Sequence, residues 1–263
     1  MRSLLVLVGK IIARCSYVFA LRKAVTIENL KRAFPNYSDY EIRVIAKKSY
    51  DNLGRVFAEM IYLRFGSLKA ISDQTVMMNP ELYHQSLAEG NGLIVVAAHY
   101  ANWEWLALGG AMGLHSNFAI VRKNIQASFT ERFLERLRLR SGNTLINSGN
   151  TYRMLRTLRE GKCVAILADQ AAPSESMRVR FMNTLVPTFE GPARLAISTG
   201  APMLFAECYL NKDRSYSINF RKIERSPSDT VESLTQAHTT CLEAMITKHP
   251  EFWLWQHRRW KNL

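Results

Sequence analysis

The sequence has few of the residues that define secreted and metal-binding proteins. Its 263 residues include only four cysteines, Cys15, Cys163, Cys208 and Cys241, with no Cys-x-x-Cys pair. This scatter excludes a disulfide-rich secreted scaffold and argues against a zinc site. We expect reduced, mostly buried thiols in a cytoplasmic compartment.

Long apolar runs are also absent. No stretch of about 20 uninterrupted apolar residues occurs, so the sequence predicts no conventional membrane-spanning helix. The N-terminal segment, MRSLLVLVGKIIARCSYVFALRK, is interrupted by Lys10 and Arg14, too early for the apolar region of a secretory signal. On a helix these basic residues share one face opposite a broad apolar surface, a pattern typical of a helix lying in a membrane interface. A helix packed on the domain, with its basic face in water, fits the segment equally well.

Acidic residues are much scarcer than basic ones. The chain has 35 Lys and Arg against 22 Asp and Glu, a formal net charge of +13. This charge favours anionic partners such as nucleic acid, anionic lipid, phosphorylated substrates or an acidic carrier protein, although it also serves simple solubility. The hydrophobic content of 48% excludes a disordered chain.

Internal repeats and low-complexity linkers are missing, which favours a single domain. Residues 26–63 predict two helices broken at Pro35, with Ser38 and Glu41 forming a capping box at the second. From residue 92 onward β-rich runs alternate with helical patterns. The predicted strands are 93–98, 117–122, 163–168, 201–209 and 215–222, and the predicted helices are 102–112, 127–140, 150–160, 190–199 and 229–248. This alternation predicts an α/β fold with a largely parallel central sheet flanked by helices.

Polar side chains follow two of these predicted strands. His99 comes directly after the apolar run GLIVVAA, within AAHYANWEWL, and Asn102 is placed to cap the next helix. Asp169 and Gln170 follow CVAILA in the same way. Ligands bind outside the carboxyl ends of the strands in open α/β sheets, so we expect these side chains at one functional edge.

His99 and Glu104 form a candidate catalytic pair. On one continuous helix they would lie roughly 140° apart and would not meet, but across a strand–turn–helix junction the carboxylate is able to fold back onto the imidazole. A carboxylate on one ring nitrogen leaves the other nitrogen as a general base. The chain has no Gly-x-Ser-x-Gly motif and no cysteine beside a His–acid pair, so the nucleophile is expected to be a substrate hydroxyl. A pair that only caps and packs is the alternative.

Several segments resemble one enzyme family. HYANWE resembles the His-x4-Asp/Glu motif of glycerolipid acyltransferases, in the Trp-Glu version of the bacterial lipid A late acyltransferases. Other matching segments follow in the family's order: NLKRAFPNYSDYE, NLGRVFAE, LADQ, TFEGPARLAISTGAPML and PEFWLWQHRRWK. Together they run from about residue 26 to residue 261. The family's Phe-Phe-Gly is replaced here by RFMN at 180–183, which leaves the local turn and the acyl-chain length open.

The resemblance implies a fold and a division of the chain. The fold would be that of glycerol-3-phosphate acyltransferase, a single domain with N-terminal amphipathic, membrane-associating helices. Residues 1–25 would form the membrane-interface helix, and residues 26–263 a lysophospholipid acyltransferase-like catalytic domain.

The C-terminal segment FWLWQHRRWK carries a pattern of its own, independent of the resemblance. Tryptophans and basic residues are typical of a bilayer interface. His257, Arg258, Arg259 and Lys261 would instead cover the active-site edge or contact an acidic carrier protein, and ordinary core tryptophans with a basic tail are the further alternative.

The resemblance also implies roles for individual residues. His99 would be the general base for a lipid hydroxyl, and Glu104 would orient it, with the thioester of an acyl carrier protein or coenzyme A as donor and no metal or organic cofactor. Backbone N–H groups at the start of the 102–112 helix, or an arginine, would bind the oxyanion.

Substrate-binding residues are implied in the same way. Arg122 and Arg140 would bind acceptor phosphates, with Arg138 as a rival to Arg140, because guanidinium groups bind phosphate bidentately. Asp169 and Gln170 would lie beside the site, Asp169 positioning Arg140 or a sugar hydroxyl. Any one of these arginines is equally explained as a solvated charge, and Asp169 as a turn residue.

The sequence thus predicts an O-acyltransferase for a lipid A-type glycolipid precursor, peripheral or monotopic at the cytoplasmic face of a bacterial inner membrane. Another lipid acceptor (a lysophospholipid, a phosphatidylinositol mannoside or an aminolipid) fits the same motif. A nucleic-acid-binding protein is disfavoured because the usual binding motifs are missing. A catalytically dead scaffold would have lost His99 or Glu104, and both are present.

Overall fold

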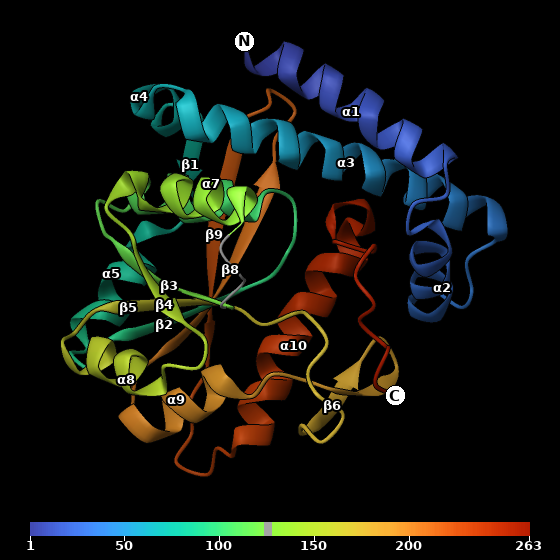
Figure 1. Cartoon of the computed structure of the whole chain (residues 1–263). Helices are drawn as coiled ribbons and strands as arrows, with labels where there is room; N and C mark the ends of the chain where they lie inside the picture. Colours follow the sequence, from blue (N-terminus) through green and yellow to red (C-terminus); the bar gives the residue numbers. More distant parts are fainter. Residues whose placement is uncertain (124–127) are drawn as a thin grey trace.

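A seven-stranded sheet forms the centre of the molecule in the computed structural model, which describes residues 1–123 and 128–263 (Figure 1). The strand order is β1-β9-β8-β2-β5-β3-β4. Its strands are β1 (Thr75–Met77), β2 (Leu93–Ala97), β3 (Phe118–Arg122), β4 (Thr144–Asn147), β5 (Cys163–Leu167), β8 (Met203–Leu210) and β9 (Tyr216–Ile223). Neighbours pair in parallel except β8 with β9, so the sheet is mostly parallel, as predicted.

Helices flank the sheet and a small hairpin lies outside it. The helices are α1 (Arg2–Val18), α2 (Lys23–Ala33), α3 (Asp39–Phe65), α4 (Leu68–Ser72), α5 (Pro80–Ala88), α6 (Trp103–Gly113), α7 (Phe129–Arg138), α8 (Thr151–Arg159), α9 (Gly191–Thr199) and α10 (Val231–Lys248), with short 3-10 turns η1 (Leu139–Ser141) and η2 (Pro250–Phe252). The hairpin pairs β6 (Arg178–Phe181) with β7 (Thr184–Pro187).

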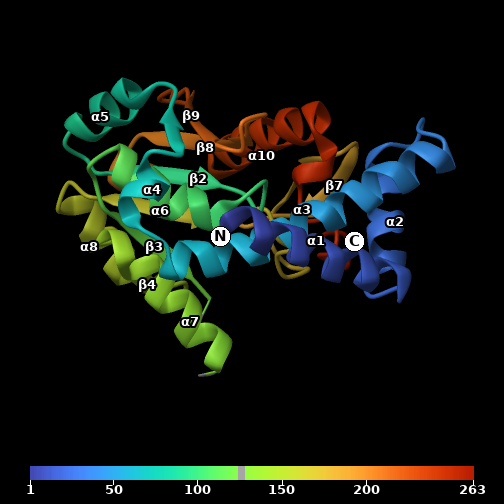
Figure 2. The same cartoon turned by 90° about the horizontal axis from the view of Figure 1, so that it is seen from above.

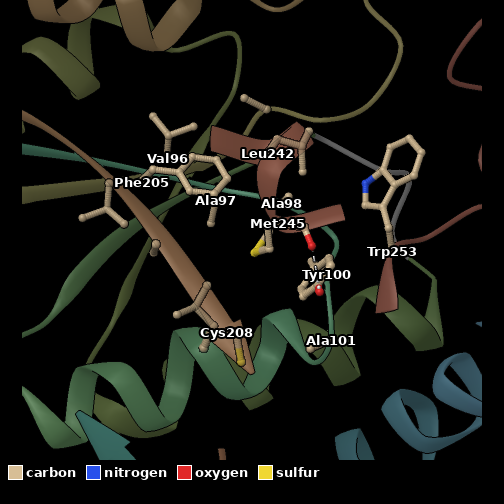
Figure 3. Packing of buried hydrophobic residues seen from close by; sticks show 14 of the residues in the cluster. Val96, Ala97, Ala98, Tyr100, Ala101, Phe205, Cys208, Leu242, Met245 and Trp253 are labelled. Carbon is tan, nitrogen blue, oxygen red and sulfur yellow. Dashed lines mark hydrogen bonds between the residues drawn. The ribbon is translucent and has the colours of Figure 1, made fainter. Parts of the chain in front are cut away.

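The central strand β2 explains the apolar run that precedes His99. All five of its residues are buried, because β2 lies between β5 and β8 with both faces covered. A parallel strand buried on both faces is expected to read as a continuous hydrophobic run. In Figure 3, Val96, Ala97 and Ala98 pack beside Phe205 of the neighbouring strand.

The N-terminal helix α1 packs along α3, side by side in both views (Figures 1 and 2). Gly9 and Gly54 meet where the helices cross: a Cβ on either glycine would lie 2.3 Å from the other's carbonyl oxygen. Two ion pairs flank the crossing, Arg2 with Glu59 and Arg14 with Asp51. None of the described helices is long and apolar enough to cross a membrane alone, but α1 and α2, bent by 87°, pass that test as a pair.

Most predicted elements are confirmed, and the differences are short ones. Every predicted strand is present within two residues at each end, and the Ser38–Glu41 capping box begins α3. Position 127 of the predicted 127–140 helix lies outside the described residues. Six further elements have no counterpart among the predicted ones, and most of them are too short for a clear periodic pattern: α4, α5, β1, β4, β6 and β7.

The RFMN segment proves to be the turn of the β6–β7 hairpin. Met182 and Asn183 both have positive φ, 47° and 60°, between the paired residues Phe181 and Thr184. Two positive φ values in a two-residue loop are what a type I′ hairpin turn requires.

Candidate active site

The sheet register places His99 beside Asp169. Strands β2 and β5 are parallel neighbours, and their last paired residues are Ala97 and Leu167. Each polar residue lies two positions beyond its strand, so both reach the same point of the carboxyl edge. This confirms that two strands place polar groups together at one edge of the sheet.

Asp169 contacts both the main chain and the ring of His99. Its Oδ2 accepts a hydrogen bond from the His99 backbone N–H at 3.0 Å, and its Oδ1 lies 2.8 Å from His99 Nδ1. Trp253 Nε1 also donates to Oδ2, at 2.9 Å. Burial alone would raise the pKa of Asp169, but the attraction of His99 and these hydrogen bonds hold it below its ordinary value. An ionised Asp169 on Nδ1 keeps the proton on that nitrogen and leaves Nε2 free to act as a base.

Gln170 and Trp103 are also neighbours of the imidazole. Gln170 Nε2 is 3.4 Å from His99 Nε2, and the Trp103 ring lies edge-on with its centroid 5.1 Å from the imidazole centroid. The His99 side chain is 18% exposed, against 3% for Asp169. The pair is therefore a buried acid behind an accessible imidazole, which suits proton abstraction from a bound hydroxyl.

The C-terminal segment forms backbone hydrogen bonds with the turn that contains His99. Leu254 N donates to the carbonyl of His99 at 3.1 Å, and Ala101 N donates to the carbonyl of Phe252 at 2.9 Å. Ala101 has a φ of 47°, in the left-handed region, which a non-glycine residue adopts at a cost that neighbouring contacts must offset. Residues 252–254 thus hold the strained turn that follows His99.

The expected interfacial position of the tryptophans in this segment is wrong. Trp253, Trp255 and Trp260 are all buried, as is Arg259, whose guanidinium donates to the carbonyl of Pro187 at 2.8 Å. Figure 3 shows Trp253 among the buried apolar residues around Tyr100, whose hydroxyl donates to the carbonyl of Met245 at 3.2 Å. These tryptophans belong to the core, which confirms the alternative prediction of ordinary core tryptophans.

Glu104 is not the partner of the imidazole, which corrects the predicted pair. It lies in the first turn of α6, 1% exposed, and its carboxylate binds the guanidinium of Arg138 through both oxygens, with Arg138 Nε 2.9 Å from Oε2. Asp169 is the carboxylate that the structure gives to His99 Nδ1. The spacing of His99 and Glu104 permits contact between them, but Asp169, which follows the neighbouring strand β5, occupies the position beside the ring. Asn102 caps α6 as expected, accepting from Trp105 N at 2.9 Å.

The three arginines have different surroundings. Arg140 donates to the carbonyls of Leu63 and Gly66 and so caps the C-terminal end of α3. Its expected contact with Asp169 is wrong, because Asp169 binds His99 and Trp253. Its role toward an acceptor phosphate stays a prediction. Arg122 pairs with Glu131. Arg138, the alternative to Arg140, binds Glu104 in the first turn of α6.

His257, in the C-terminal segment, lies close to Asp169 and His99. Its Nδ1 is buried without a hydrogen-bond partner among the described residues. Burial, opposed by the attraction of Asp169 and aided by nearby His99 and Arg259, lowers the pKa of His257 to about 4. It is therefore neutral near pH 7. This position agrees with the alternative in which the WLWQHRRW segment covers the site.

Comparison with known proteins identifies the family of this chain. The sequence profile of the bacterial lipid A biosynthesis acyltransferases matches residues 2–262. The chain is 25% identical to a lipid A biosynthesis palmitoleoyltransferase of Escherichia coli (strain K12) over 92% of this chain and 79% of that protein. A lipid A biosynthesis lauroyltransferase of the same strain gives the same identity and coverage. A phosphatidylinositol mannoside acyltransferase of Mycobacterium tuberculosis (strain CDC 1551 / Oshkosh) is 24% identical, over 81% of this chain and 69% of that protein. The chain is an acyltransferase that belongs to the bacterial lipid A biosynthesis acyltransferase family.

Proposed function

We propose that the protein moves a fatty acyl chain from a thioester to a hydroxyl of a lipid A-type glycolipid precursor. The observation that supports it most is the His99–Asp169 pair at the carboxyl edge of the sheet, with Nδ1 2.8 Å from the carboxylate and a partly exposed imidazole. The substrate classes rest on the names of the relatives, two of which act on lipid A.

The reaction follows from this geometry. His99 Nε2 removes the proton of the acceptor hydroxyl while Asp169 stabilises the imidazolium that forms. The acceptor oxygen then attacks the thioester carbonyl and gives a tetrahedral oxyanion. When the carbon–sulfur bond breaks, the imidazolium returns its proton to the sulfur. An ester and a free thiol are the products, and His99 is neutral again.

Arg138 is the arginine we assign to substrate anions. Glu104 fixes its Nε and Nη2, so Arg138 is held in one orientation while its side chain remains 16% exposed. A guanidinium fixed by a buried carboxylate is preorganised to bind a phosphate or a developing oxyanion. Arg122 is 21% exposed beside Glu131 and remains a second candidate for acceptor phosphate.

We place the enzyme at the cytoplasmic face of the inner membrane, held there by α1. Exposed apolar side chains gather on α1 and α3: Leu4, Leu7, Val8, Ile11 and Ile12 on α1, and Phe57, Ile61 and Phe65 on α3. Such a set is unusual for a surface in water and suits insertion into a lipid interface. The net charge of +13 adds attraction to anionic headgroups.

A second acceptor class has a specific observation in its favour, because a related protein is named for phosphatidylinositol mannoside. The test is acyl transfer by the purified enzyme from labelled acyl carrier protein or acyl-coenzyme A to three acceptors: a lipid A precursor, a phosphatidylinositol mannoside and a lysophospholipid. We expect product with the lipid A precursor. Product with only another acceptor would overturn the lipid A assignment and retain the acyltransferase chemistry.

A further inference from the structure

The buried carboxylate of Glu59 connects the N-terminal helix to the start of α6. Glu59 lies on α3 and is 1% exposed. Its Oε1 accepts from Arg2 Nε at 3.0 Å and from Arg2 Nη2 at 2.6 Å. Its Oε2 accepts from Asn102 Nδ2 at 2.8 Å and from the Tyr216 hydroxyl at 2.6 Å. One carboxylate thus joins α1, β9 and the residue that caps α6.

Arg2 is built into this site rather than lying on the surface. Its side chain is 12% exposed, and its guanidinium carbon lies 4.4 Å from the centroid of the Trp105 ring. Its Nη1 donates to Gln74 Oε1. A buried carboxylate requires a partner of opposite charge, because an unpaired charge in the interior is strongly unfavourable. Arg2 is the cation that bonds to Glu59.

Asn102 transmits the position of Glu59 to the site. While its amide nitrogen donates to Glu59, its Oδ1 accepts from Trp105 N at 2.9 Å, so the carboxylate sets the orientation in which Asn102 caps α6. Asn102 closes the turn that begins at His99 and includes the strained Ala101. A second residue of α3, Asn52, donates to the carbonyl of Ala101 at 3.4 Å.

We infer that Arg2 is a positioning residue: docking of α1 through Arg2 holds Glu59, Asn102 and therefore the His99 turn in the reactive geometry. The helix that we assign to the membrane is then also a structural part of the active site. This inference rests on the proposed function for the role of His99 and goes beyond it, because it makes the activity depend on the docked state of α1.

The direct test compares Arg2→Ala with Arg14→Ala. Both changes remove an ion pair between α1 and α3, but Arg14 is 68% exposed, and its partner Asp51 has no contact with Asn102 among the described residues. With acceptor in detergent micelles, so that membrane binding plays no part, we expect Arg2→Ala to lower kcat by about 10- to 100-fold, as small misplacements of reacting groups do. KM for the donor should change by less than about twofold, and Arg14→Ala should retain the wild-type kcat.

A charge-free replacement separates positioning from folding. Arg2→Gln combined with Glu59→Gln keeps hydrogen-bonding groups on both sides without an unpaired charge, so the double variant should have a higher kcat than either single variant. Melting temperatures measured in parallel identify any variant that has failed to fold. An unchanged kcat in folded Arg2→Ala, or equal losses in Arg2→Ala and Arg14→Ala, would overturn the inference.

A spectrum without substrate keeps this test independent of the acceptor. In nitrogen-15-labelled protein, the His99 imidazole and the Trp253 indole signals report the two groups bound to Asp169. We expect both to shift in Arg2→Ala and to stay in place in Arg14→Ala. Absence of acyl transfer in the wild type would contradict only the proposed function, whereas unmoved His99 and Trp253 signals in Arg2→Ala would contradict the inference itself.

Discussion

Two buried carboxylates near the site, Asp169 and Glu104, have different partners and therefore different expected effects when changed. Asp169 binds an imidazole that must gain and lose a proton, whereas Glu104 binds a guanidinium whose charge is permanent. The first arrangement sets a tautomer, and the second sets the position of a cation.

Asp169→Asn should lower kcat by about 10²–10⁴-fold, because an amide at this position no longer stabilises the imidazolium or fixes the Nδ1 proton. Glu104→Gln is the matched control: it should destabilise the fold by roughly 3–5 kcal/mol by leaving Arg138 unpaired, and Glu104→Gln with Arg138→Gln should recover part of that loss. Initial rates and urea unfolding curves measure both effects. A wild-type kcat in folded Asp169→Asn would contradict the role of Asp169.

His238 makes stability depend on pH away from the site. It is buried on α10, and burial, reinforced by Arg259, lowers its pKa to about 4 from an ordinary 6.5. In the unfolded chain His238 therefore gains a proton below about pH 6.5, whereas in the folded protein it gains one only below about pH 4. As the pH falls through this window, the free energy of unfolding should therefore decrease by a total of roughly 3 kcal/mol. His238→Gln should remove this contribution to the pH dependence of stability. Denaturant unfolding at pH 7.5 and pH 5 tests this, and an equal pH dependence in the variant would contradict it.

For single residues, the sequence predicts which of them lie at the site better than it predicts which of them contact one another. His99, Asp169 and Gln170 are predictable at one edge because each follows an apolar run. Their pairing depends on which strands are neighbours, and the β2–β5 adjacency skips β3 and β4 in chain order. Arg140 and Arg138 are two positions apart, yet one caps α3 and the other binds Glu104. Spacing alone does not distinguish them.

At the scale of elements, the crossing of α1 and α3 depends on two glycines. A methyl group at Gly54 would approach the carbonyl oxygen of Gly9 to 2.3 Å, so the helices must separate or bend. Gly54→Ala should cost about 1–3 kcal/mol and increase proteolytic cleavage within residues 1–20. Gly191→Ala is the control, since a Cβ there meets nothing within 4 Å. Limited proteolysis with unchanged cleavage in Gly54→Ala would show that α1 is not held by this crossing.

The long elements are predictable because their periodicity and caps are local. The Ser38–Glu41 box begins α3, and the alternation after residue 92 gives the main strands and helices. The short edge strands β1 and β4 owe their structure to pairing with β9 and β3, which no local pattern encodes. The buried C-terminal tryptophans show the same limit, since aromatic and basic residues are typical of both an interface and a core.

At the scale of the whole molecule, the exposed apolar residues of α1 and the net charge of +13 predict lipid binding that depends on both terms. Binding to vesicles containing an anionic phospholipid should weaken as salt rises from 0.05 to 0.5 M, about the range over which screening shortens to a few ångströms. Leu4→Asp, at a side chain 67% exposed, should weaken binding by about 10- to 100-fold without changing the melting temperature. Vesicle sedimentation measures both, and equal binding of Leu4→Asp and wild type would exclude α1 as the contact.

We propose that His99 is the base with which this enzyme transfers an acyl group. The most direct measurement is the initial rate of transfer from a labelled acyl carrier protein thioester to a lipid A precursor, for wild type and His99→Ala, with melting temperatures confirming that both are folded. Loss of the base predicts a rate lower by about 10²–10⁴-fold. Equal rates in the two proteins would remove His99 from the mechanism and contradict the account.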